Sequence, residues 1–433
     1  MTKKYVLKGA TLADGSIRDI LIDGDLIVEV AASIDFETSV DCSGLIALPG
    51  FVDLHTHLRE PGFEASETVL TGSKAAAKGG YTAVHPMANT SPVADTAGVV
   101  EQVAALGEEA GYVDVYPIGA VTVGLEGRQL AELGAMAESK AKVRVFSDDG
   151  KCVSDPLMMR RALEYVKSFG GVIAQHAQDP RLTEGAQMNE GVVSAELGLS
   201  GWPGVAEESI IARDVMLAET LGSRIHVCHL STARSVEIVR WAKNRGIAVT
   251  AEVTPHHLLL TEELARTYNP VYKVNPPLRT QTDVEALREA LIDGTIDIIG
   301  TDHAPHPAEA KECEWDAAAF GMIGLETAAS VAQLVLIDSG RSNWARLAEV
   351  MSVKPAEIAG DDDHGNSIAA GQLANLALID PKAKRQIANP TESKSQNNPY
   401  VGLELPGRVL HTIFRGRFTV RDGALVMHSQ KGA

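Results

Sequence analysis

The middle of the chain alternates short apolar runs with longer amphipathic stretches. The apolar runs cover residues 45–54, 82–85, 113–118, 143–146, 172–175, 225–228, 247–251 and 296–299. Helical spacing of apolar residues covers residues 155–169, 207–221, 233–245 and 283–291. Ser231-Thr232 and Gly246 flank the third helical stretch as capping residues. This alternation predicts parallel strands joined by crossover helices, and a (β/α)8 barrel over residues 50–364 fits its length best.

The two ends of the chain show a different pattern, with short strand-like runs separated by turns. Strand-like runs cover residues 5–7, 20–22, 26–30, 376–380 and 413–420, with turns at Asp23-Gly24-Asp25 and Asp422-Gly423. Residues 386–407 are polar and contain proline, and are expected to form a loop. We predict that residues 1–49 and 365–433 pair into one small composite β-sandwich.

Functional residues of such a barrel collect at the C-terminal ends of its strands, and here each apolar run is followed at once by polar residues. His55 and His57 end the first run and, two residues apart in extended backbone, point to the same side. The later ends carry Asp148, Asp149, His176, His229, Asp302, His303 and His306. Histidines and carboxylates at neighbouring strand ends fit one or two divalent cations, with zinc the best match. Spacing alone does not decide between Asp148 and Asp149.

The composition limits the possible binding partners of the protein more than it limits the fold. The net charge of −18 argues against nucleic acid and anionic membranes, and an anionic substrate would need cations placed locally. No apolar run approaches the ~18 residues of a membrane helix, and the N-terminus lacks a signal-peptide pattern. The four cysteines are far apart and are expected to be free thiols. A cytoplasmic protein with a small-molecule substrate is therefore expected.

Four longer motifs stand at or near the strand ends: Asp53-Leu54-His55-Thr56-His57-Leu58-Arg59-Glu60-Pro61-Gly62, Val253-Thr254-Pro255-His256-His257, Lys273-Val274-Asn275-Pro276-Pro277-Leu278-Arg279 and Thr301-Asp302-His303-Ala304-Pro305-His306. These motifs resemble those of the stand-alone bacterial dihydroorotases of the amidohydrolase superfamily. The resemblance covers nearly the whole chain. It implies a metal-dependent hydrolase barrel that interconverts N-carbamoyl-L-aspartate and (S)-dihydroorotate in pyrimidine biosynthesis.

The resemblance also implies two zinc ions in each subunit. The implied metal ligands are His55 and His57 for the first ion, His176 and His229 for the second, Asp149 as the bridge, and Asp302 on the first ion. Asp149 is preferred because it is the second aspartate of the family's Asp-Asp-Gly string. The two ions would activate a bridging hydroxide and polarise the amide carbonyl. Asp302 would act as the general acid and base that moves the proton to the leaving nitrogen.

Substrate contacts follow from the same resemblance. Arg59, Asn89 and His306 would bind the substrate carboxylate, and His57 would also touch the substrate. Asn275 and the backbone of Phe320 and Gly321 would contact the ring. Arg59 has the strongest physical argument, because a planar guanidinium binds a carboxylate through two parallel hydrogen bonds. The competing interpretation of Arg59 is a surface ion pair with Glu60 or Glu64.

Some features depart from the family pattern or leave alternatives open. Ala88 and Ala319 stand where the family commonly has proline, which changes loop rigidity but removes no functional side chain. The runner-up function is another cyclic amidohydrolase, a hydantoinase or an allantoinase. Those enzymes typically use a carboxylated lysine as the bridge, and this chain has no lysine at the end of the strand of residues 143–146. A non-catalytic scaffold is disfavoured because all six ligand positions are occupied. A homodimer and an association with aspartate transcarbamoylase are open options. His85, His256, His257 and His303 are expected to be structural or supporting groups.

Overall fold

Eight parallel strands form the centre of the molecule, in a computed structural model that describes residues 4–426. They are β6 (Phe51–Thr56), β7 (Tyr81–Pro86), β8 (Asp114–Val115), β9 (Val145–Phe146), β10 (Val172–Gln175), β13 (Ile225–Val227), β14 (Val249–Val253) and β15 (Ile298–Ile299). Hydrogen bonds join these strands into two parallel groups, one in the order β6-β7-β8 and the other in the order β15-β14-β13-β10-β9. Parallel bridges from Gly119 to Phe146 and from Thr56 to His303 join the groups at both edges. The ring is closed, which confirms the predicted barrel.

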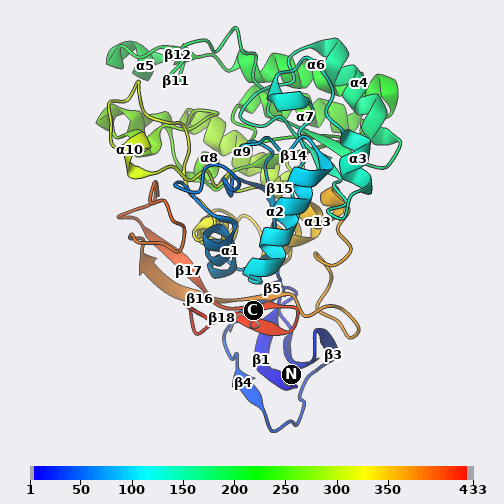
Figure 1. Cartoon of the computed structure of the whole chain (residues 1–433). Coiled ribbons are helices and arrows are strands. Elements are labelled where there is room, and N and C mark those ends of the chain that lie inside the picture. The colour runs from blue at the N-terminus through cyan, green and yellow to red at the C-terminus, as the bar shows by residue number, and fades with distance from the viewer. Residues whose placement is uncertain (1–3, 427–433) are drawn as a thin grey trace.

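Helices connect successive strands and cover the outside of the barrel (Figure 1). The main ones are α1 (Val69–Lys78), α2 (Ala97–Ala110), α3 (Leu133–Glu138), α4 (Pro156–Lys167), α6 (Val205–Leu221), α7 (Ala233–Asn244) and α9 (Gln281–Asp293). The predicted cap of α7 is confirmed, because the Thr232 side chain accepts a hydrogen bond from the Ser235 amide. Among the described residues, no helix combines the length and apolar character that a membrane crossing requires.

Shorter elements lie in the loops and after the last strand. They are β11 (Met188–Asn189), α5 (Val192–Leu197), β12 (Gly201–Trp202), α8 (Pro255–Leu259), α10 (Ala308–Lys311), α11 (Ala328–Ala332), α12 (Trp344–Ala348), α13 (Lys354–Ala359), the 3-10 turns η1 (Val123–Leu125), η2 (Glu262–Thr267) and η3 (Pro270–Tyr272), and the π-turns η4 (Gln333–Asp338) and η5 (Glu349–Val353). Ile358 and Ala359 of α13 pack with inward-facing strand residues such as Leu54 and Val172. The barrel interior is therefore a packed core and not a channel.

The two ends of the chain pair with each other, as predicted, and their strands form one continuous sheet where a small β-sandwich was expected. Its strands are β1 (Tyr5–Leu12), β2 (Ile17–Asp23), β3 (Leu26–Ala31), β4 (Ser39–Asp41), β5 (Ile46–Pro49), β16 (Leu376–Gln386), β17 (Glu404–Phe414), β18 (Arg417–Arg421) and β19 (Ala424–Leu425). Antiparallel pairing of β16 with β5 makes a continuous nine-stranded sheet. Figure 1 shows this terminal sheet at one end of the molecule, beyond the barrel. The domain boundaries near residues 50 and 365 stay a prediction, and residues 1–3 and 427–433 lie outside the described residues.

Two apolar runs were each predicted as one strand, and both predictions are wrong. Residues 45–54 divide at Gly50 into β5 of the terminal sheet and β6 of the barrel. A side chain at Gly50 would overlap Thr82, with its Cβ only 2.3 Å from Oγ1, so the crossing needs glycine. Residues 413–420 form a hairpin between β17 and β18, because Arg415 and Gly416 both have positive φ and make a tight turn. The predicted loop 386–407 is also shortened, since β17 begins at residue 404.

Candidate metal centre and active site

All six predicted metal ligands lie at the C-terminal ends of barrel strands and are buried. His55 belongs to β6, while the other five, His57, Asp149, His176, His229 and Asp302, follow the strands β6, β9, β10, β13 and β15 within three residues. These positions come from five strands separated by up to about 250 residues of chain, and the barrel closure brings them together.

Asp149 is the centre of this cluster. Its Oδ1 lies 3.0 Å from His176 Nδ1 and 3.3 Å from His229 Nε2. The same oxygen is 3.4 Å from His55 Nε2, and Oδ2 is 3.3 Å from His57 Nε2. The ligand atoms therefore fall into two compact groups, His55 and His57 on one side and His176 and His229 on the other, which share Asp149. This arrangement suits a carboxylate between two cations.

Asp302 lies on the His55 and His57 side only. Its Oδ1 is 3.1 Å from His57 Nε2 and 3.5 Å from His55 Nε2. Burial opposes its ionisation, but the neighbouring histidines outweigh burial and lower the pKa of Asp302 to about 2. Asp302 is thus an anionic group beside one half of the cluster, as the resemblance implies.

One observation that does not depend on the sequence motifs also fits a metal cation at this cluster. His55 Nε2 is buried and has no hydrogen-bond partner among the described residues, whereas a buried polar atom normally has one. Burial lowers the pKa of His55, yet the charges of Glu252 and Asp149 raise it well above its ordinary value. The field that favours a proton there would favour a cation in the same way.

The choice between the two adjacent aspartates is visible in their contacts. Asp148 accepts hydrogen bonds from the amides of Val121 and Thr122 at 2.8 and 2.9 Å and from the Thr122 hydroxyl. All of its contacts serve the loop after β8. Asp149 instead contacts the four histidines, and its role as the bridge stays a prediction.

Glu252 is a supporting residue that the sequence reasoning missed. It lies on β14, and its carboxylate contacts His55 Nδ1, His226 Nε2 at 3.3 Å and the His229 amide at 3.1 Å. A carboxylate on the far nitrogen of a ligating histidine fixes the ring and its tautomer. The available signal was a glutamate inside an apolar strand, because a buried charge must be paired. Cys228 lies close to His55 and Glu252, and burial raises the pKa of its thiol far above the usual range.

Three residues of this region have left-handed backbone although none is glycine. The φ angles are +64° for Arg59, +29° for His229 and +48° for Asp302. Such conformations cost free energy and are retained where the surroundings hold them, commonly at functional sites. At each of these positions the left-handed backbone points the side chain in a different direction from the one that a continuing extended strand would give it.

Arg59 is a partly buried cation that forms no ion pair in the described chain, and the carboxylates that stabilise its charge, Asp302, Asp149 and Glu67, act from beyond ion-pair distance. Its Nε donates to Pro305 O at 3.2 Å and its Nη2 lies 3.3 Å from His306 Nε2. Glu60 and Glu64 instead accept hydrogen bonds from the amides of Val69 and Gly62, so the competing ion-pair interpretation of Arg59 is wrong. Burial lowers the pKa of Arg59 to about 10, which leaves it charged at neutral pH.

The other side chains predicted to bind the substrate differ in which of their polar atoms already have hydrogen-bond partners. Asn89 Oδ1 lies 3.0 Å from His57 Nδ1, so Asn89 also orients that ring. Asn275 Nδ2 donates to Gln178 at 3.0 Å, while its buried Oδ1 has no partner in the described chain. Burial and Arg59 lower the pKa of His306 to about 3, which keeps the ring neutral.

The turn at Phe320 and Gly321 offers less than the resemblance implies. The Gly321 amide already donates to Lys273 O at 3.0 Å, and Phe320 O accepts from His306 Nε2 at 2.8 Å. The Phe320 amide donates to no other described residue. It is therefore the backbone group of this turn that is free for a ligand.

The four histidines that were not assigned as ligands divide in two. His257 and His303 are fixed by the Thr254 hydroxyl and by Glu67, which supports a structural role. His256 and His85 are buried, and their Nε2 atoms have no hydrogen-bond partner in residues 4–426. Burial lowers the pKa of both, so the rings are neutral.

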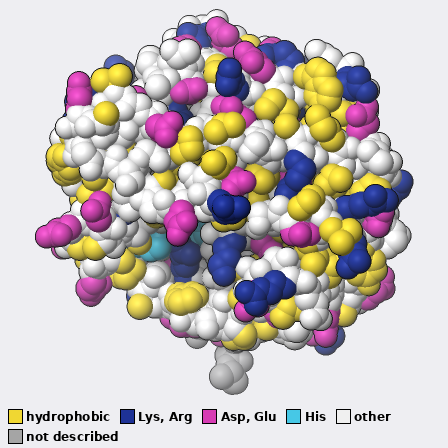
Figure 2. All heavy atoms as spheres, turned by 90° about the horizontal axis from the view of Figure 1, so that it is seen from above, with side chains coloured by type: hydrophobic (Ala, Val, Ile, Leu, Met, Phe, Trp, Pro, Cys, Tyr) yellow, Lys and Arg dark blue, Asp and Glu magenta, His cyan; other side chains and the backbone are white. Residues whose placement is uncertain are grey.

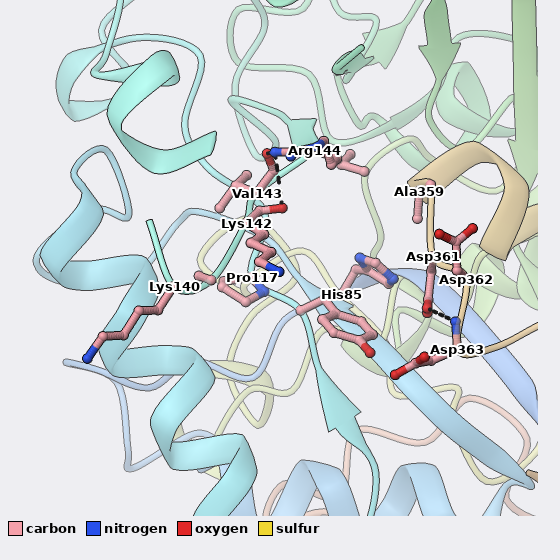
Figure 3. A pocket seen from close by; sticks show the side chains of 14 residues that line it. His85, Pro117, Lys140, Lys142, Val143, Arg144, Ala359, Asp361, Asp362 and Asp363 are labelled. Carbon is pink, nitrogen blue, oxygen red and sulfur yellow. Dashed lines mark hydrogen bonds between the residues drawn. The ribbon is translucent and has the colours of Figure 1, made fainter. Parts of the chain in front are cut away.

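His85 does not face the metal ligands but lines a separate cavity of about 340 Å³ (Figure 3). That cavity lies beside residues 140–145, which lead into β9 and include its first residue, and residues 359–363, which start at the last residue of α13. Because Asp149 comes after β9, the cavity and the ligand cluster lie towards opposite ends of that strand. A larger cavity of about 590 Å³ adjoins His306 on the other end. Figure 2 shows Lys, Arg, Asp and Glu intermixed on one face, with histidine visible in a hollow beside Lys or Arg side chains.

Comparison with known proteins gives sequence relatives over almost the whole chain. A family model described as Dihydro-orotase-like matches residues 44–235. A protein of Streptomyces coelicolor named Dihydroorotase is 66% identical over 426 residues, covering 98% of this chain and 99% of the relative. A Mycobacterium tuberculosis protein of the same name is 51% identical over 416 residues, covering 95% and 97%.

Similar solved structures carry other names. An L-hydantoinase (dihydropyrimidinase) from Arthrobacter aurescens has a TM-score of 0.87 at 25% identity, covering 98% of this chain and 97% of that one. A dihydropyrimidinase from Brevibacillus agri has a TM-score of 0.84 at 23% identity, covering 98% and 96%. The second likeness, at its low identity, bears on the fold alone.

Proposed function

This chain belongs to the dihydroorotase family, and from that premise we propose that it acts through two zinc ions and a pocket that selects a carboxylated ring. The activity is that of a dihydroorotase, a cyclic amide hydrolase that interconverts N-carbamoyl-L-aspartate and (S)-dihydroorotate in pyrimidine biosynthesis. The metal identity, the metal count and the residue roles are the proposed part.

His55, His57, Asp149 and Asp302 would hold the first zinc, and Asp149, His176 and His229 the second. Nitrogen and carboxylate donors of this kind are the usual protein ligands of zinc. When bound, the metals supply an activated water nucleophile and polarise the scissile amide. Glu252 holds the His55 ring by its far nitrogen, which keeps Nε2 turned towards the cluster.

Asp302 is proposed as the proton carrier. Its carboxylate is anionic at neutral pH and can accept a proton from the attacking water in ring opening. It then delivers that proton to the departing ring nitrogen, and the reverse path applies to ring closure. Two described carboxylates lie near His57 Nε2, Asp302 at 3.1 Å and Asp149 at 3.3 Å, and Asp149 also contacts His176 and His229.

One observation carries the choice of substrate: Arg59 is a charged guanidinium at the mouth that forms no ion pair in the described chain. An unpaired cation in a partly desolvated site is costly unless a ligand supplies the anion. The carboxylate of dihydroorotate does so, and the hydantoin ring does not. Asn275 Oδ1 is a free acceptor for a ring N–H, and the Phe320 amide is a free donor for a ring carbonyl.

A hydantoinase remains the second candidate because the similar solved structures carry that name. The test is to assay one purified preparation with dihydroorotate, hydantoin and allantoin side by side. We expect turnover of dihydroorotate at least a hundredfold above the neutral rings. Comparable rates on hydantoin would contradict the proposed substrate choice. A cytoplasmic location, a homodimer and an association with aspartate transcarbamoylase stay predictions of the resemblance.

A further inference from the structure

The turn of residues 319–321 is held in place by side chains from outside it. The carbonyl oxygens of Ala319 and Gly321 accept hydrogen bonds from Lys311 Nζ at 2.8 and 3.0 Å. Gly321 O also accepts from Asn397 Nδ2 at 3.1 Å. With Phe320 O bonded to His306, every carbonyl of the turn is fixed, and the Phe320 amide is the one donor left free.

Asn397 comes from an unexpected part of the chain, the loop between β16 and β17 of the terminal sheet. It is buried, and Nδ2 also donates to Ala304 O at 2.9 Å. Its Oδ1 accepts from the His306 amide at 3.1 Å, and its own carbonyl accepts from the Ile323 amide at 3.1 Å. One side chain therefore ties the backbone that carries His306 to the turn that carries Phe320.

Lys311, at the end of α10, holds the same turn from the other side. Its ammonium donates a third hydrogen bond to Lys273 O at 3.1 Å, two residues before Asn275. It is buried and forms no ion pair with any described carboxylate. Three carbonyl acceptors match the three donors of an ammonium group, while burial and then the charge of Lys273 lower the pKa of Lys311 to about 7.

We propose that Lys311 and Asn397 are positioning residues for the reaction and act as one clasp on the substrate-binding turn. The clasp sets where the Phe320 amide and the His306 ring meet the substrate, and neither of its side chains is hydrogen-bonded to a candidate metal ligand. This inference rests on the proposed function. It makes the terminal sheet a contributor to the active site, because its loop supplies half of the clasp.

The turn needs such support for a physical reason. Gly321 has a φ of +146°, and a Cβ there would lie 2.9 Å from both Ala304 O and the His306 ring. The turn thus passes tightly against the His306 segment in a conformation that only glycine adopts readily. Its geometry comes from the clasp, since it belongs to no helix or strand.

The main test compares Asn397→Ala with Asn398→Ala as a matched control. Asn398 lies next in the loop and is equally buried, but its side chain accepts only from the Tyr400 amide. In Asn397→Ala, Ala304 O and the His306 amide lose their hydrogen-bond partner, and Gly321 O keeps Lys311 as its one donor. We therefore expect the KM for dihydroorotate to rise at least about tenfold, with kcat within about threefold. Zinc content should match wild type. The control should keep the wild-type KM.

Lys311→Met provides a second route if Asn397→Ala does not fold, and the double variant tests the clasp as a unit. Because both residues hold Gly321 O, the double variant should raise KM little beyond the stronger single variant. Equal KM values for Asn397→Ala and the control, or single effects that multiply in the double variant, would overturn the clasp. Wild-type protein that does not turn over dihydroorotate would instead refute the proposed function.

Discussion

Replacing Arg59 by Met tests whether the mouth of the barrel selects a carboxylate. The guanidinium has two contacts in the protein, to Pro305 O and to His306, and neither neutralises its charge. Removing the charged partner of a desolvated substrate carboxylate costs on the order of 2–5 kcal/mol. At about 1.4 kcal/mol per factor of ten, kcat/KM for dihydroorotate should fall by at least about a hundredfold.

The assay uses two rings and two further variants. Dihydrouracil lacks the carboxylate, so any hydrolysis of it should change little in Arg59→Met, and both zinc ions should remain bound. Arg59→Lys keeps the charge but loses the planar fork, and we expect it to recover part of the loss. Arg346→Met is the control, because Arg346 also donates to backbone carbonyls, those of Leu291 and Ile296, on the outside of the barrel.

The pH dependence of this effect has a definite sign. Burial lowers the pKa of Arg59 to about 10, so the group stays protonated below that pH and loses charge only above it. The ratio of wild-type to Arg59→Met activity should therefore be constant from about pH 6 to pH 8. Equal losses on charged and neutral rings would mean that Arg59 supports the loop instead of binding the carboxylate, and would refute the reasoning.

Three further substitutions test the metal centre. Elemental analysis of wild-type protein should give about two zinc ions per chain, and one ion or fewer in active protein would contradict this. Asp149→Ala should lose most of both ions, because the two ligand groups share that residue. Asp302→Asn should lower kcat by at least 10²–10⁴-fold while the second zinc stays bound, and near-normal turnover would move the proton role elsewhere. Glu252→Gln should weaken zinc binding about 10–100-fold, because the variant releases the His55 ring. Competition with a chelator measures this affinity, and an unchanged affinity would make Glu252 a purely structural residue.

The barrel and its ligand cluster could be predicted because both depend on local patterns. A short apolar run followed by polar residues marks a strand end, and parallel strands bring all such ends to one face. β10 occupies residues 172–175 as predicted, and His176 follows it directly. The divided run 45–54 could not be predicted from hydrophobicity, because both sheets bury apolar residues, and only Gly50 marks the crossing.

Residues that act across long sequence separations were out of reach. Asn397 contacts Gly321, and Glu252 contacts His55, through pairs that only the folded chain brings together. An asparagine in a polar loop carries no signal of such contacts, since asparagine is common in loops. Residue spacing could not separate Asp148 from Asp149 for the same reason, because the hydrogen bond of Asp148 to Thr122 also spans the fold, and only the family resemblance favoured Asp149.

The fold and the substrate choice are thus set by different parts of the chain. The barrel is shared with structures named hydantoinase, so it cannot by itself explain a carboxylated substrate. The difference must lie in loops at the strand ends, and there the unpaired charge of Arg59 is the group that a neutral ring would leave unsatisfied. Its left-handed backbone shows that the loop, and not the strand, directs this side chain. A net charge of −18 makes that local cation more important, because the global field repels the anion that the site must bind.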